Sequence, residues 1–187
     1  TEFPFREEGD LVMGATSKGR WSYACSKAID EYLALAYHRE QGLPAVIVRF
    51  FNTVGPRQIG DYGMVLPRFV SAALSGRALE VHGDGAQSRC FCDVRDVVQA
   101  LPRLLASPQC AGRVFNLGRD ESISMHALAR LVVATLGSSS GIRMVPYEQA
   151  FAAGFDDLAV RQPDLSRIRE AIVDEDKTSI VQDIVAE

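Results

Sequence analysis

Residues 45–52 read Ala-Val-Ile-Val-Arg-Phe-Phe-Asn, and this stretch decides the fold. A short unbroken apolar run is typical of a strand that is covered on both faces in a parallel sheet. A helical pattern precedes the run, and Gly42 and Pro44 are positioned to end that helix. A helix that leads into a buried strand predicts an α/β fold, in which ligands bind beyond the carboxyl ends of the strands. Asn52 therefore lies where a binding site is expected.

The helix before this strand carries Tyr23 and Lys27, four positions apart. This spacing places both side chains on one face of the helix. An ammonium group beside a tyrosine hydroxyl favours the phenolate, so such a tyrosine can exchange a proton near neutral pH, as a general acid–base does. Beyond Lys27 the pattern predicts a broad buried stripe, made of Ala28, Ile29, Tyr32, Leu33, Leu35, Ala36 and Tyr37.

The rest of the chain alternates predicted helices and strands. Asp93, Ser124 and Asp164 are expected to cap three helices at their N-termini. A further helix is predicted over residues 64–76, and a strand over residues 79–82 that a turn closes. In the helix after Asp93, the residues expected to face the core are Val94, Val97, Val98, Leu101, Leu104 and Leu105. A last helix is expected over residues 179–187.

Several motifs in a fixed order carry a resemblance to a known family. They are Tyr23-x-x-x-Lys27, the run from Arg49 to Gln58, the run from Gly63 to Phe69, the run from Leu79 to Arg89, Asp93 to Val98, Val114 to Gly118, and Arg161 to Ser166. In this set the chain resembles the extended short-chain dehydrogenase/reductases. The group that it resembles most is the NAD-dependent nucleotide-sugar epimerase/dehydratases.

The resemblance implies an α/β fold, namely the C-terminal portion of a Rossmann-like doubly wound parallel sheet with a smaller α/β substrate-binding lobe. Residues 1–55 would be the remainder of the NAD-binding domain, to which residues 93–118 return. Residues 56–92 and 119–187 would form the lobe. The sequence contains no Gly-x-Gly-x-x-Gly loop to hold a dinucleotide pyrophosphate. We therefore expect an incomplete chain that is inactive when isolated.

The resemblance also implies a reaction, with NAD as cofactor and a UDP-sugar as substrate. Tyr23 would take the proton of the sugar 4-hydroxyl, Lys27 would hold the cofactor ribose, and Phe51 would lie beside the cofactor. The motif from Arg49 to Arg57 favours a UDP-hexose 4-epimerase that acts through a transient 4-keto sugar. UDP-glucuronate decarboxylase, nucleotide-sugar 4,6-dehydratase and a non-catalytic nucleotide-sugar-binding relative stay open as alternatives.

The expected substrate-binding residues are spread over more than a hundred positions: Asn52, Val65, Leu66, His82, Arg89 and Arg161. By the resemblance, Arg89 and Arg161 contact the substrate diphosphate, a role that suits the guanidinium fork. His82 would line the nucleobase pocket. We expect all six residues to converge on one cleft, because small molecules usually bind in pockets between two parts of a fold.

Composition limits the other classes of function. The net charge is −4 and 47% of the residues are hydrophobic, which favours a globular chain and gives no basic surface for nucleic acid. No apolar run reaches the length of a membrane span. The four cysteines lack the spacing of a metal site, so we expect reduced thiols, no metal and a cytoplasmic location. We also expect a homodimer that associates through helices of the Rossmann domain.

Overall fold

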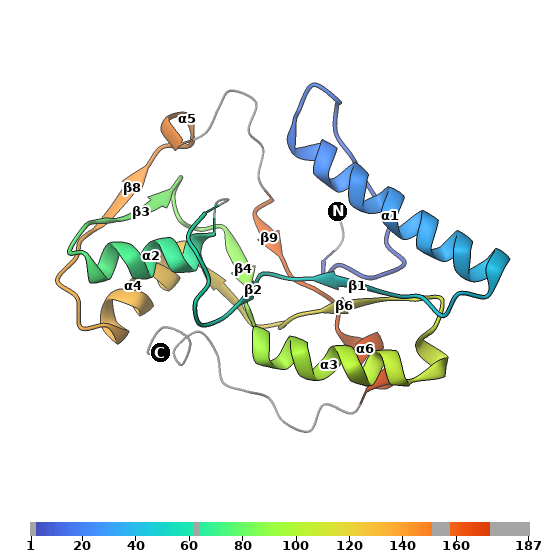
Figure 1. Cartoon of the computed structure of the whole chain (residues 1–187). Coiled ribbons are helices and arrows are strands. Elements are labelled where there is room, and N and C mark those ends of the chain that lie inside the picture. Colours follow the sequence, from blue (N-terminus) through green and yellow to red (C-terminus); the bar gives the residue numbers. More distant parts are fainter. Residues whose placement is uncertain (1–2, 62–63, 151–157, 173–187) are drawn as a thin grey trace.

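The structure is a computed structural model that describes residues 3–61, 64–150 and 158–172. Figure 1 shows two parts side by side, with short strands between them. The first part is built around two parallel strands, with one helix above them and two below. Its elements are α1 (Arg20–Gln41), β1 (Val46–Phe50), α3 (Val94–Ala106), the 3-10 helix η1 (Pro108–Cys110), β6 (Arg113–Leu117) and α6 (Ser166–Ala171).

The second part packs two helices against another parallel pair of strands. Its elements are α2 (Val65–Leu74), β3 (Leu79–His82), α4 (Met125–Thr135), β8 (Ile142–Val145) and α5 (Tyr147–Ala150). Strands β3 and β8 run parallel, with Leu79 opposite Ile142. The mixed α/β architecture with parallel pairing confirms the predicted fold class.

Five short strands lie between the two parts. They are β2 (Thr53–Val54), β4 (Ser88–Cys90), β5 (Cys92–Asp93), β7 (Ser122–Ser124) and β9 (Val160–Arg161). Strand β2 pairs with β5 in parallel, while β4 pairs with β7 in antiparallel and with β9 in parallel. This arrangement brings Asn52, at the end of β1, next to β4.

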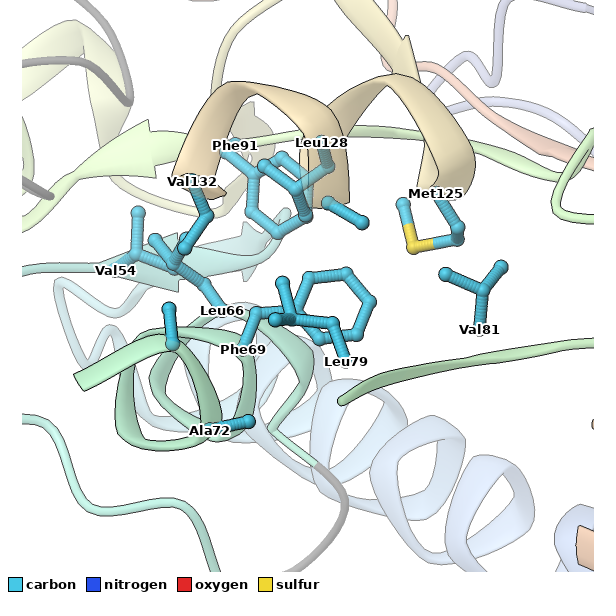
Figure 2. Close-up of a cluster of buried hydrophobic side chains, with 12 residues drawn as sticks. Val54, Leu66, Phe69, Ala72, Leu79, Val81, Phe91, Met125, Leu128 and Val132 are labelled. Carbon is cyan, nitrogen blue, oxygen red and sulfur yellow. The ribbon is translucent and has the colours of Figure 1, made fainter. Parts of the chain in front are cut away.

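Each part has its own hydrophobic core. The core of the second part contains side chains from α2, β3 and α4 that point toward one another, among them Phe69, Leu79 and Leu128 (Figure 2). The core of the first part lies between the β1–β6 pair and the helices α3 and α6, and includes Leu104 and Phe115. Helix α6 thus packs with residues 93–118, although the predicted domain division assigns residues 119–187 to the lobe. The division itself stays a prediction.

The caps and element positions follow the local sequence closely. The Asp93 carboxylate accepts a hydrogen bond from the Arg95 backbone N–H at 2.7 Å, and the Ser124 hydroxyl accepts one from Ala127 at 3.1 Å. The Asp164 carboxylate accepts from the Ser166 N–H at 2.9 Å and so caps α6 from two residues before its start. The predicted strand over residues 79–82 is β3. The helix predicted over residues 179–187 lies outside the described residues.

The predicted burial of α1 is wrong for most of its stripe. Only Ala28 is buried, whereas Ile29 is 52% exposed, Leu33 53% and Tyr37 58%. The reason is that the described residues cover only the side of this long helix that faces β1. Helix α3 shows the same effect: Val97 and Leu104 are buried, but the remaining residues expected to face the core include three that are exposed, Val94, Val98 and Leu105.

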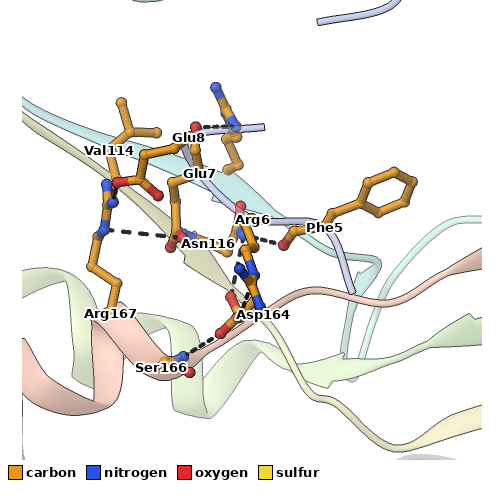
Figure 3. A network of polar contacts seen from close by, with 10 residues as sticks. Phe5, Arg6, Glu7, Glu8, Val114, Asn116, Asp164, Ser166 and Arg167 are labelled. Carbon is orange, nitrogen blue, oxygen red and sulfur yellow. Dashed lines mark hydrogen bonds and ion pairs between the residues drawn. The ribbon is translucent and has the colours of Figure 1, made fainter. Parts of the chain in front are cut away.

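A polar network ties the N-terminal segment to the first part (Figure 3). The buried Glu7 carboxylate accepts a hydrogen bond from the Asn116 N–H at 2.8 Å, and the Asn116 amide donates to the Phe5 carbonyl at 2.9 Å. Arg167 on α6 donates to the Val114 carbonyl at 3.1 Å and pairs with Glu8. The segment before α1 is therefore fastened across β6.

Candidate functional site

A groove of about 1100 Å³ lies against the second part of the molecule and reaches the strands between the two parts. The six residues expected on the substrate side all line it: Asn52, Val65, Leu66, His82, Arg89 and Arg161. They come from the end of β1, the start of α2, the end of β3, and strands β4 and β9. The fold therefore brings together residues that the sequence separates, and their individual roles stay predictions.

Asn52 holds an unusual backbone conformation at the end of β1. Its φ angle is +38°, in the left-handed region that residues other than glycine seldom adopt. The side-chain amide of Asn52 donates a hydrogen bond to the Cys90 carbonyl at 2.9 Å, which ties the end of β1 to β4. Such conformations persist where the surrounding structure enforces them, often at binding sites. Burial raises the pKa of the neighbouring Cys90 thiol to about 11, with a smaller contribution from Asp120 and Glu121, so this thiol stays protonated.

Arg89 and Arg161 bring two positive charges to adjacent strands. Arg89 is only 7% exposed, and its guanidinium donates to the Ser88 carbonyl at 2.7 Å. Arg161 lies opposite it on β9, in parallel register. Side chains that face each other on neighbouring strands share one face of a sheet, where like charges repel. Two arginines on the groove wall form a site suited to an anion with several oxygens, such as a diphosphate.

Charged residues also surround His82 at the end of β3. Burial lowers the pKa of the His82 imidazole, and the charge of Arg68 lowers it further, with Glu80 acting in the opposite direction. The Glu80 carboxylate pairs with Arg143 on the neighbouring strand, and this hydrogen bond lowers the pKa of Glu80. His82 thus presents a neutral ring to the groove at neutral pH.

Tyr23 and Lys27 lie outside the lining of this groove. They share one face of α1, with the Lys27 ammonium 5.9 Å from the centre of the Tyr23 ring, and Tyr23 is 71% exposed. The ammonium group pairs with the Asp30 carboxylate at 2.7 Å, and this hydrogen bond raises the pKa of Lys27. Phe51 does not line the groove either. It packs against Gly118, where an added Cβ atom would lie 2.8 Å from the Phe51 Cβ.

Among the described residues, Tyr23 and Lys27 could hold one part of a nicotinamide dinucleotide. The exposed phenol of Tyr23 and the exposed ammonium of Lys27 are hydrogen-bonding groups that fit a ribose with its attached ring. A glycine-rich turn that could fit the pyrophosphate does not occur in the sequence.

Within the described ranges, no three histidine, cysteine or acidic side chains are grouped as metal ligands. None of the described helices is long and apolar enough to cross a membrane.

Sequence reasoning missed several residues that line the groove, including Thr53, Arg68, Gln87 and Tyr147. Two of them carry buried oxygen atoms that accept no hydrogen bond from the described residues, Thr53 Oγ1 and Gln87 Oε1. Spacing contained a signal for Gln87, because it precedes Arg89 by two positions and alternate residues of a strand share a face. No sequence pattern indicated Tyr147. Its ring packs against Gly83, where an added Cβ atom would lie 2.3 Å from it, and this contact joins distant segments.

The chain is similar to known nucleotide-sugar enzymes. A family model described as the NAD dependent epimerase/dehydratase family matches residues 4–118. The UDP-N-acetyl-alpha-D-glucosaminuronate decarboxylase of Bacillus cytotoxicus is 43% identical over 168 residues, which are 89% of this chain and 52% of that protein. UDP-glucuronic acid decarboxylase 6 of Arabidopsis thaliana is 35% identical over 161 residues, 86% of this chain and 45% of the relative. The chain thus spans about half the length of these curated relatives.

Solved structures show the same arrangement of elements. The UDP-N-acetylglucosamine 4-epimerase of Methanobrevibacter ruminantium M1, in complex with UDP-N-acetylmuramic acid, matches with a TM-score of 0.83 at 25% identity, over 98% of this chain and 55% of that one. DesIV, a dTDP-glucose 4,6-dehydratase of Streptomyces venezuelae with NAD and TYD bound, matches with a TM-score of 0.79 at 27% identity, over 97% of this chain and 52% of the other.

Proposed function

The chain belongs to the NAD-dependent epimerase/dehydratase family, and we propose on this basis that it forms the substrate-binding portion of a UDP-sugar enzyme. Members of this family are NAD-dependent enzymes. The observation that carries the proposal is the groove, in which Arg89 and Arg161 lie side by side on one wall and His82 lies on another segment. A UDP-sugar fits these groups, because the two arginines can bind its diphosphate and the partly buried His82 can contact its nucleobase.

The chemistry of the residues that line the groove suggests an orientation for the ligand. His82 lies at the end of β3, where a neutral ring can stack on a nucleobase. Asn52 lies just beyond the carboxyl end of β1, at the edge of the sheet where α/β folds bind ligands. We therefore place the nucleobase toward His82, the diphosphate at the two arginines and the sugar toward Asn52.

The reaction that we propose begins with oxidation of the sugar at carbon 4. Tyr23 accepts the proton of the 4-hydroxyl as general base, and Lys27 lies beside it on the same face of α1. A bound NAD, whose ribose Tyr23 and Lys27 would hold, would supply the acceptor and the donor of the carbon 4 hydride. The protein orients the sugar and holds the proton at the Tyr23 oxygen between the removal and the return of this hydride.

Decarboxylation of a UDP-hexuronate is the outcome that we favour. A ketone at carbon 4 is in the β position to the carboxylate at carbon 6. The bond between carbons 5 and 6 then breaks, carbon dioxide leaves, and the electron pair moves toward the 4-oxygen as an enolate. A proton added at carbon 5 restores the 4-ketone, which is then reduced to the 4-hydroxyl of the pentose. Both curated relatives named above are decarboxylases of UDP-hexuronic acids, and one is 43% identical to this chain. This similarity supports decarboxylation ahead of the 4-epimerase that the motif from Arg49 to Arg57 favours.

A UDP-hexose 4-epimerase is the second candidate. In that reaction the 4-keto sugar rotates and is reduced on its other face. The match to a UDP-N-acetylglucosamine 4-epimerase over 98% of the chain supports it, although the shared fold does not distinguish epimerases from the dehydratase that matches almost as well.

A product assay on the full-length enzyme distinguishes the candidates. We expect UDP-N-acetylglucosaminuronate or UDP-glucuronate to yield carbon dioxide and the UDP-pentose in the presence of NAD, with no change in UDP-glucose. Conversion of UDP-glucose into its 4-epimer without release of carbon dioxide would establish the second candidate instead. Tight binding of UDP with no turnover of any of these sugars would indicate a non-catalytic relative.

A further inference from the structure

We propose that Gln87 recognises the nucleobase of the substrate by accepting a hydrogen bond from a ring N–H, as on N3 of uracil. The inference rests on the proposed function, because it takes the ligand of the groove to be a nucleotide. It adds a residue that selects among nucleobases, which the similarity to UDP-sugar enzymes does not supply.

Gln87 lies between the strand that ends in His82 and the strand that carries Arg89. It lines the groove together with both of these residues. It therefore lies between the position proposed for the nucleobase and the position proposed for the diphosphate. A nucleobase that binds near His82 would therefore lie beside Gln87.

The Gln87 amide is held in one orientation. Its nitrogen Nε2 donates a hydrogen bond to the His82 carbonyl at 2.9 Å. Only the nitrogen of the amide can donate to a carbonyl, so this contact assigns the other atom, Oε1, as an acceptor. A flip of the amide would break the contact and bring two oxygens together.

The acceptor is buried and has no donor in the described part of the chain. Buried polar atoms in folded proteins nearly always have a hydrogen-bond partner, and one without a partner weakens the structure. A ligand with a suitably placed N–H would satisfy Oε1. Thr53 Oγ1, the other unpartnered oxygen on the groove, lies next to Asn52 and therefore on the sugar side.

This arrangement selects bases by the hydrogen at one ring nitrogen. Uracil and thymine carry a hydrogen on N3, which can be donated to Oε1. Cytosine has a lone pair on N3, which would face the lone pairs of Oε1 and leave both acceptors unsatisfied. We therefore expect the groove to bind UDP and TDP similarly and to discriminate against CDP.

Calorimetry of the protein with UDP, TDP and CDP tests the inference without any mutation. We expect CDP to bind about ten- to a hundred-fold more weakly than UDP, since a polar group left unpaired on each side typically costs that much affinity. TDP should bind within about threefold of UDP. Equal affinities for UDP and CDP would overturn the role of Gln87 and leave the proposed function intact.

Two variants then assign the selectivity to this residue. Gln87→Leu should weaken UDP binding roughly tenfold and CDP binding less, so that the ratio of the two affinities falls toward one. The matched control is Gln58→Leu, because Gln58 also lines the groove and donates from Nε2 to the Thr53 carbonyl at 3.2 Å, on the sugar side. It should change UDP and CDP binding by the same factor. A Gln87→Leu protein that kept the wild-type preference for UDP would contradict the inference, and failure of all three nucleotides to bind would contradict the proposed function itself.

Discussion

Arg89 on β4 lies directly opposite Arg161 on β9, so that two guanidinium groups share one wall of the groove. Arg89 is almost wholly buried there, and its guanidinium donates to the Ser88 carbonyl within its own strand. Two guanidinium groups on neighbouring strands can together donate several hydrogen bonds to one anion. The pair is therefore suited to a ligand with several oxygens, such as the diphosphate of the proposed substrate.

Loss of Arg89 should weaken nucleotide binding. A hydrogen bond to a charged group contributes about 1.5–3 kcal/mol, so Arg89→Ala should lower the affinity for UDP roughly ten- to a hundred-fold in calorimetry. Arg161→Ala should act in the same direction. Arg130→Ala is the matched control, because Arg130 is exposed on α4 and does not line the groove. An Arg89→Ala protein with wild-type affinity for UDP would remove the diphosphate role.

Loss of the Tyr23 hydroxyl should stop catalysis and spare binding. Tyr23→Phe keeps the ring, which is 71% exposed on α1, and removes only the group proposed to transfer the proton. We expect turnover by the full-length enzyme to fall by a factor of at least about a hundred, a typical loss for a general acid–base, while calorimetry detects unchanged affinity for UDP. Activity within tenfold of wild type would show that Tyr23 is not the acid–base.

Removal of Arg68 should raise the pKa of His82. Burial lowers the pKa of this imidazole first and the charge of Arg68 second, so Arg68→Ala leaves only the first cause and the opposing charge of Glu80. NMR titration of the imidazole signals should show the midpoint of His82 moving to higher pH. The chain has three histidines, so a His82→Gln variant assigns the signal that belongs to His82. An unchanged His82 midpoint would mean that Arg68 is too far away or too well solvated to act on it.

The carboxylate of Asp93 should stabilise the protein only above acidic pH. Burial acts to raise the pKa of Asp93, but the hydrogen bonds from the Arg95 side chain and backbone outweigh it and hold the pKa below its ordinary value. The stabilisation is therefore fully present above the unfolded value of about 3.9 and is lost as the pH falls through the lower folded value. Asp93→Ala should reduce the free energy of unfolding by about 1 kcal/mol at pH 7, with a smaller difference at pH 3.

Urea titrations at the two pH values measure this difference. Asp10→Ala is the control, since Asp10 is exposed and lies outside the helices and strands. The role of Asp93 as a charged cap would be contradicted if the cost of Asp93→Ala were the same at pH 3 as at pH 7.

Local sequence was enough to predict much of this fold. The apolar run at residues 45–48 became β1, and the caps at Asp93 and Ser124 depend only on atoms two or three residues away. The groove could be predicted as well, because the resemblance to a family supplied residues from separate segments. In each case the information lay within a few neighbouring positions or in a motif.

Contacts between distant segments could not be predicted in this way. The hydrogen bond between Glu7 and Asn116 joins residues 109 positions apart, and no pattern in either segment indicates it. The bidentate ion pair between Arg49 on β1 and Glu31 on α1, at 2.7 Å, likewise depends on how the helix crosses the strand. The unpartnered oxygen of Gln87 depends on the shape of a turn, and periodicity carries no information about it.

The exposed stripe of α1 leads to the last prediction, which concerns assembly. Ile29, Leu33 and Tyr37 are spaced four residues apart and therefore lie along one side of the helix, and each is more than half exposed. We expect a second copy of the chain to cover this stripe, in line with the homodimer expected from the sequence, because apolar side chains in such a row are typical of interfaces. Leu33→Arg should then convert a dimer into a monomer in analytical ultracentrifugation. The helix itself should persist, since arginine favours helices and position 33 is exposed. Arg39→Glu, which inverts a charge on the same helix away from the stripe, should leave the mass unchanged. A Leu33→Arg protein with the same mass as wild type would show that α1 does not form the dimer contact.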